Sequence, residues 1–225
     1  LLCVNDSECP VEGDAADADL TTVVDTTKAV TLLYQTYKAF DTGVELKAAV
    51  VEWLAGCDRK AVVSERYGHR IGSWDVSKVT DMRELFRNAT EFNDDVSGWD
   101  TSSVTDMSHM FNTARAFGGD ISGWNTSKVT DMNSMVAENV LFDGDLSGWD
   151  VSSVTDMCYM FFNATAFNGD VSRWDTSSVT DMNHMFNRAS VFNGDVSRWD
   201  VSSVIDMHRM FQNANAFDGD FTGWD

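Results

Sequence analysis

The sequence predicts an α/β repeat protein, an open, leucine-rich-repeat-like solenoid of 25-residue units. Tryptophan recurs every 25 residues without insertion or deletion from Trp74 onward, and every methionine falls in one of two further columns with the same period. A 25-residue unit is too short to bury its own apolar face, so successive units must stack into one continuous core. The tryptophans of this column are Trp74, Trp99, Trp124, Trp149, Trp174, Trp199 and Trp224.

Each unit is expected to combine a helical turn with a short strand. Val104, Met107 and Met110 follow the three-to-four spacing that is typical of one or two helical turns. Gly119-Asp120 and its equivalents indicate a turn after that segment. Residues 121–126 then form a short run rich in aromatic and β-branched residues, which favours a strand.

The chain divides into three predicted regions. Residues 1–24 are acidic and indicate a flexible lead-in, in which Cys3 and Cys9 are spaced to close a small loop. Residues 25–73 predict a helical N-terminal cap that covers the open end of the core, with one helix over 25–40 and a second that begins at the capping box Thr42-Gly-Val-Glu45 and ends at Gly56. Residues 74–225 hold six repeats and reach one residue into a seventh, so we expect an array truncated at its C-terminus.

The repeat resembles a known family. Residues 192–214, FNGDVSRWDVSSVIDMHRMFQNA, are similar to the 25-residue repeat of BspA-like surface proteins, also called the mycoplasma-lipoprotein-type repeat, and the resemblance covers about residues 44–225. It implies a leucine-rich-repeat-like solenoid on a secreted or surface-anchored protein, with a role in adhesion and in protein or matrix binding, and no catalytic residues. Three residues depart from the repeat, Asp94, Val136 and Asn139, and we expect looser packing at Asn139.

Composition restricts the partners and the location. A net charge of −20 makes nucleic acid and anionic membrane surfaces poor partners. No stretch approaches 18 apolar residues, so no membrane insertion is expected in this segment. Paired cysteines near the N-terminus and four Asn-x-Ser/Thr triplets favour an extracellular or cell-surface location. The triplets begin at Asn5, Asn88, Asn125 and Asn163.

The sequence does not predict an enzyme. It has four histidines, and none lies in an HExxH motif; GxSxG and CxxC motifs and a Gly-rich phosphate loop are also absent. His109 and His184 share a column but stand three units apart, too far to act on one substrate.

Binding residues are expected where the residue type varies while the repeat stays fixed. Tyr159 and Phe162 form an aromatic pair in such positions, and an exposed aromatic pair is suited to anchoring a partner. His109, His184 and Arg209 occupy the same column as Tyr159. We therefore expect a non-catalytic surface or secreted module for adhesion, with a protein or glycan partner. The alternative is an architectural spacer of a cell wall or matrix without a specific ligand.

Aspartate columns raise the question of a cation. Oxygen ladders such as Asp120, Asp145, Asp170 and Asp195 offer the ligand type that Ca²⁺ prefers. Their spacing matches neither an EF-hand loop nor the nine-residue Ca²⁺ repeat, and aspartates in turns commonly accept backbone hydrogen bonds instead. We expect that structural role, no cofactor and no metal, with weak Ca²⁺ binding by these aspartates as the alternative.

Overall fold

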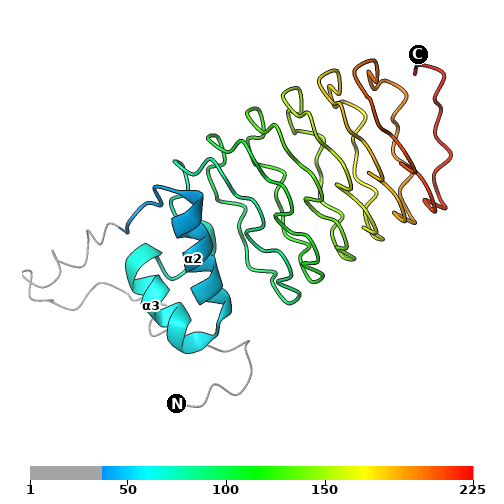
Figure 1. Cartoon of the computed structure of the whole chain (residues 1–225). Helices are drawn as coiled ribbons and strands as arrows, with labels where there is room; N and C mark the ends of the chain where they lie inside the picture. The colour runs from blue at the N-terminus through cyan, green and yellow to red at the C-terminus, as the bar shows by residue number, and fades with distance from the viewer. Residues whose placement is uncertain (1–36, 225) are drawn as a thin grey trace, which may run out of the picture.

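The computed structural model describes residues 37–224, in which two helices lie at one end of a stack of six coils (Figure 1). The helices are α2 (Gly43–Leu54) and α3 (Cys57–Tyr67), followed by the short 3₁₀ helix η1 (Ile71–Ser73). We number the coils 1 (75–99), 2 (100–124), 3 (125–149), 4 (150–174), 5 (175–199) and 6 (200–224). The predicted lead-in with Cys3 and Cys9, and most of the helix predicted over 25–40, lie outside the described residues.

The helix α2 covers the first coil. Thr42 is its N-cap and accepts a hydrogen bond from the Glu45 backbone N–H, as the capping box predicted, while the Glu45 carboxylate accepts from the Asp41 N–H. The buried face of α2 ends in Trp53, whose ring meets Trp74 edge-on at 5.3 Å between centroids. The helix α3 was not predicted, because few of its residues are buried and no regular apolar spacing marks it. None of the described helices is long and apolar enough to cross a membrane.

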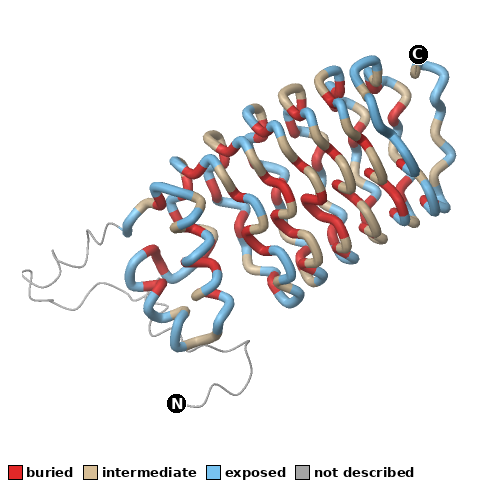
Figure 2. Tube along the Cα trace, viewed as in Figure 1, coloured by how far each residue is buried: buried red, intermediate tan, exposed pale blue. Residues whose placement is uncertain are grey.

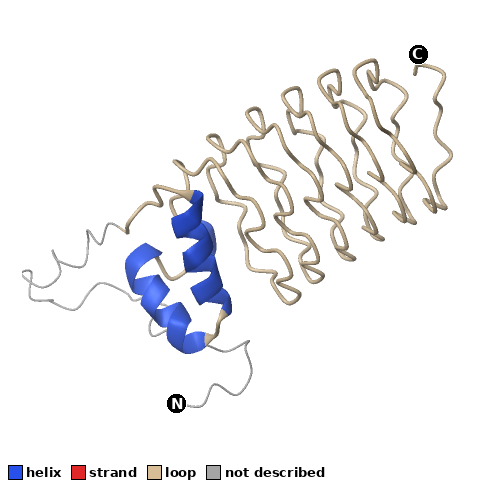
Figure 3. Ribbon diagram, in the orientation of Figure 1, coloured by secondary structure: helices blue, strands red, loops and turns tan. Residues whose placement is uncertain are grey.

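The predicted α/β class, a leucine-rich-repeat-like solenoid of strands and helical turns, is wrong. Within the coils, the described residues form neither an α-helix nor a β-strand (Figure 3). They form turns, and neighbouring coils are joined by isolated parallel bridges between aspartates 25 residues apart. The bridges are Asp81–Asp106, Asp106–Asp131, Asp131–Asp156, Asp156–Asp181 and Asp181–Asp206.

Hydrogen bonds that alternate in direction replace the predicted helical turns. The N–H groups of Met107, His109 and Phe111 donate to carbonyl oxygens of coil 3 at 2.8–3.0 Å. Between them, the Met110 N–H closes a turn onto the Met107 carbonyl three residues back. His109 and Thr113 take left-handed backbone conformations with φ of 56° and 62°, which an α-helix does not allow. We call this row of inter-coil bonds the ladder.

Aspartate and asparagine side chains remove the predicted strand. The side-chain oxygens of Asp120 and Asn125 accept from the backbone N–H two residues on, at 2.9 and 3.1 Å. The Trp124 N–H closes a turn onto the Ile121 carbonyl. Residues 121–126 therefore bend at both ends, and β-propensity is overridden by these local side-chain bonds.

The predicted stacking of successive units into one continuous core is confirmed, and residues of the same column lie on one another. Trp99 and Trp124 stack at 6.3 Å and 6° between their rings, and Phe117 and Phe142 at 6.1 Å and 7°. A buried indole N–H needs an acceptor, and that of Trp124 donates to the Val96 carbonyl of the preceding coil at 3.2 Å. Figure 2 shows the resulting buried interior, repeated from coil to coil.

Two departures from the repeat have structural causes. The expectation of looser packing at Asn139 is wrong, because the residue is fully buried and hydrogen-bonded. Its amide donates to the Phe117 carbonyl at 2.9 Å and its side-chain oxygen accepts from the N–H groups of Leu141 and Phe142. Asp94 replaces the glycine of other units and accepts from the Trp53 indole at 2.7 Å, which joins α2 to coil 1.

Thr113 offers a test of the left-handed positions. A left-handed conformation costs about 1–2 kcal/mol for most L-residues, and asparagine tolerates it better than a β-branched residue does. We expect Thr113→Asn to raise the free energy of unfolding by about 0.5–1 kcal/mol in urea denaturation. The reverse change in the same column, Asn88→Thr, should lower it by a similar amount. Equal stability of all three proteins would show that these conformations carry no strain.

Candidate binding surface

A column of left-handed residues forms a stripe along the side of the stack. One such residue per coil, with φ between 53° and 58°, lies two residues after the methionine at which the ladder segment begins. Their residue types differ from coil to coil while the backbone around them repeats. Members of adjacent coils lie side by side, as the contact between Tyr159 and His184 shows. We call the column the variable stripe: Glu84, His109, Ser134, Tyr159, His184 and Arg209.

Aromatic and cationic side chains gather on the stripe at coils 4 and 5. The rings of Tyr159 and His184 stack face to face at 4.6 Å and 5°. Phe162 meets Tyr159 edge-on at 5.3 Å and His184 at 6.5 Å. The guanidinium of Arg188 lies over the Phe162 ring at 5.9 Å, within cation–π range. We call Tyr159, Phe162, His184 and Arg188 the aromatic cluster; its three rings are half-buried and Arg188 is exposed.

The electrostatics of the cluster favour a neutral histidine and leave cations available. Burial, with contributions from the nearby charges of Arg209 and His208, lowers the pKa of His184, which favours the neutral ring. Its Nδ1 lies in hydrogen-bond contact with the Asn183 side-chain oxygen. Within the described part of the chain, Arg188 and Arg209 form no salt bridge. The site therefore combines apolar ring surface with two uncompensated guanidinium groups.

The structure groups most of the predicted binding residues and separates one. Tyr159, Phe162 and His184 are in contact, and Arg209 follows His184 in the stripe. His109 lies apart, because Ser134 of coil 3 stands between it and Tyr159, and its Nδ1 is buried without a hydrogen-bond partner.

The sequence reading missed Arg188 and His208 as neighbours of this surface. The ring of His208 meets His184 edge-on at 5.8 Å. The 25-residue register could have predicted both contacts, because each residue lies next to the residues that stand about 25 positions before and after it in the sequence.

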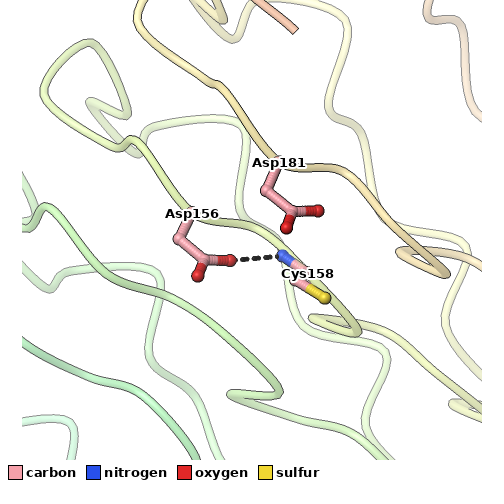
Figure 4. Close-up of side chains that lie close together, drawn as sticks. All are labelled: Asp156, Cys158 and Asp181. Atoms are coloured by element: carbon pink, nitrogen blue, oxygen red, sulfur yellow. Dashed lines mark hydrogen bonds between the residues drawn. The ribbon is translucent and has the colours of Figure 1, made fainter. Parts of the chain in front are cut away.

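A second group of side chains lies beside the stripe, where two aspartates and a cysteine converge (Figure 4). One ligand atom from each of Asp156, Cys158 and Asp181 lies within 4.8 Å of the others. An Asp156 side-chain oxygen accepts from the Cys158 N–H at 2.8 Å. Burial, together with the charges of Asp181 and Asp156, raises the pKa of the Cys158 thiol to about 12. Burial and repulsion from Asp131 and Asp181 raise the pKa of Asp156.

These three groups do not make up a full metal coordination shell. Structural Zn²⁺ takes four protein ligands and Ca²⁺ six to eight oxygens, whereas three donors converge here. The aspartates of the Ca²⁺ alternative, Asp120, Asp145, Asp170 and Asp195, are not part of the converging group found in the described residues. Each instead accepts a hydrogen bond from the serine N–H two residues on. The serine hydroxyl, followed by this N–H, lowers the pKa of each aspartate.

The carboxylate pair gives a prediction for stability against pH. A carboxyl whose pKa is raised by folding stabilises the fold below its unfolded pKa, and that contribution is lost as the pH rises through the folded pKa. We therefore expect Asp156→Asn, which keeps the acceptor for Cys158, to raise the Tm at pH 7 and to have little effect near pH 3. Asp120→Asn is the matched control: because its pKa is lowered, its neutralisation should lower the Tm at pH 7.

The opposite result at Asp156 would reveal a cation. If Asp156→Asn lowered the Tm at pH 7, and a chelator removed the difference between variant and wild type, the cluster would hold a metal ion rather than two repelling carboxylates.

The comparisons with known proteins place the chain in a family. No curated protein and no solved structure shows a significant match. One family model, described as "Mycoplasma protein of unknown function, DUF285", matches residues 59–157 and 139–225. Since these two matches together span well over half of the sequence, the chain belongs to the DUF285 family.

Proposed function

We propose that this chain is a non-catalytic, cell-surface or secreted binding module that holds a protein or glycan partner on the variable stripe. The observation that carries the proposal is the stacked pair of Tyr159 and His184, with Phe162 and Arg188 against it, on a face whose equivalent positions in the other coils are mostly polar. The fixed columns hold the coils together, whereas these four side chains are not needed for the repeat.

The chemistry of the aromatic cluster fits a partner with an apolar face and a negative group. Tyrosine and arginine are enriched among the residues that contribute most to binding. The stacked rings offer flat apolar surface, against which a sugar ring or an apolar side chain packs. Arg188 and Arg209 offer planar donors that suit a carboxylate or sulfate. Against a net charge of −20, such a cationic surface is local.

A non-catalytic role is supported by the chemistry of Cys158, the cysteine that directly precedes Tyr159 in the sequence. The thiolate is the reactive form of cysteine, and a pKa of about 12 leaves the Cys158 thiol protonated at neutral pH. The His184 ring is stacked on Tyr159 and its Nδ1 contacts the Asn183 side-chain oxygen, so both groups hold this histidine in place within the aromatic cluster.

A surface location is supported by the family. The matching model describes a Mycoplasma family, and the repeat resembles that of BspA-like surface proteins, whose expected roles are adhesion and matrix binding. The acidic charge disfavours nucleic acid as a partner.

The test is a binding screen with a variant that keeps the backbone. Tyr159→Asn with Phe162→Asn removes both rings, and asparagine suits both positions: it tolerates left-handed backbone, and Asn112 and Asn187 already occupy the Phe162 column. The probes are an array of neutral and acidic glycans and a panel of immobilised extracellular-matrix proteins. We expect wild type to bind at least one probe and the double variant to bind it about 30-fold more weakly, as for loss of about 2 kcal/mol.

The control is Ser134→Asn, which changes the same stripe outside the cluster and should alter the affinity less than twofold. The double variant and the control should both melt as wild type does. If wild type binds none of the probes, or binds one equally well after loss of both rings, the proposal fails. The first outcome would favour an architectural spacer, for which the rigid stack of coils is sufficient.

A further inference from the structure

The far side of coil 6 exposes residues that every other coil buries. Met207 is 37% exposed and Phe221 43%, whereas Met182 and Val196, their equivalents in coil 5, are 0% and 1% exposed. Phe217 and Trp224, whose counterparts are buried in coil 5, are only partly buried. Figure 2 shows the change: coil 6 lacks most of the buried interior of the coils before it. We call this side of coil 6 the open face.

The open face also carries a row of free backbone donors. In coil 5, four N–H groups donate to coil 6 at 2.8–2.9 Å: those of Met182, His184, Phe186 and Arg188. The equivalent N–H groups of coil 6 have no acceptor among the described residues: those of Met207, Arg209, Phe211 and Asn213. The donors are two residues apart, so they match an extended segment that presents every second carbonyl.

We propose that the open face is a docking surface for one further coil of this same repeat, laid parallel and in register. The same face is covered in this way at five interfaces within the stack, where each coil meets the next. A coil of this motif supplies carbonyls at the right spacing for the four donors. It also supplies a donor for the free Ile205 carbonyl, as Ile205 itself does for Thr180 at 2.8 Å. This inference does not depend on the function of the variable stripe.

A second copy of the chain does not offer this complement. Its matching row of carbonyls, on the outer side of coil 1, begins at Asp81, and the start of α2 covers that carbonyl. A Cβ added at Gly43 would lie 2.0 Å from the Asp81 carbonyl oxygen. If the open faces of two chains packed against each other, the free N–H groups of one chain would face the free N–H groups of the other and would find no acceptors.

The experiment appends a seventh repeat to the full chain by adding a second copy of residues 201–225 directly after Asp225, which is itself the equivalent of Asp200 and keeps the 25-residue register. Amide hydrogen exchange measured by NMR reports on the four donors directly. We expect the N–H groups of Met207, Arg209, Phe211 and Asn213 to exchange at least 100-fold more slowly in the extended chain than in wild type. Those of Met182, His184, Phe186 and Arg188 should be slow in both.

The matched control carries the same appended repeat with aspartate in place of its valine and methionine that face coil 6, the equivalents of Val204 and Met207. In this control, the four N–H groups should exchange as fast as they do in wild type. The proposal is overturned if the intact seventh repeat protects none of them. It is also overturned if wild type already protects them and sediments as a dimer, because a second copy would then cover the open face.

Discussion

The alternating hydrogen bond is the interaction on which the stack depends. Along each ladder, one N–H turns sideways to the next coil and the following one turns back to a carbonyl three residues earlier. This alternation requires a left-handed residue at two positions per coil, and none of these residues is glycine. The strict 25-residue period, without insertion or deletion, keeps each donor opposite its carbonyl. The stacked tryptophan and phenylalanine rings follow from that register, since they repeat wherever the backbone repeats.

The same constraint separates the residues that hold the fold from those that are free to change. Aspartates such as Asp120 fix turns through their side-chain oxygens, and tryptophans such as Trp124 join neighbouring coils through the indole N–H. The ladder uses only backbone atoms at Tyr159 and His184. The residue type at these positions can therefore change without loss of the inter-coil hydrogen bonds. A surface of this type can alter its chemistry without altering its stability much, which is the property a recognition surface requires.

The sequence allowed the stacking and the grouping of site residues to be predicted, but not the secondary structure. Identical spacing put Tyr159 and His184 in one column, and the structure places their rings in contact. Residues 121–126 were misread as a strand, because their aromatic and β-branched content was weighed above the turn-forming Asp120 and Asn125 at either end. The bond from Trp53 to Asp94 joins residues 41 apart and lies outside any periodic pattern. No rule of spacing predicts it.

The aspartate bridges set an electrostatic cost that grows with the number of coils. In the middle of the column, burial raises the pKa of Asp131 and Asp156, with repulsion from neighbouring aspartates adding to it. At the first coil, hydrogen bonds from Arg83 outweigh burial and lower the pKa of Asp81. At the last coil, bonds from the His208 N–H and the Asn183 amide lower that of Asp206. A coil added to the open face turns Asp206 into an interior member of this column. The backbone bonds and apolar burial gained at each interface must therefore exceed the repulsion between successive carboxylates for the stack to extend.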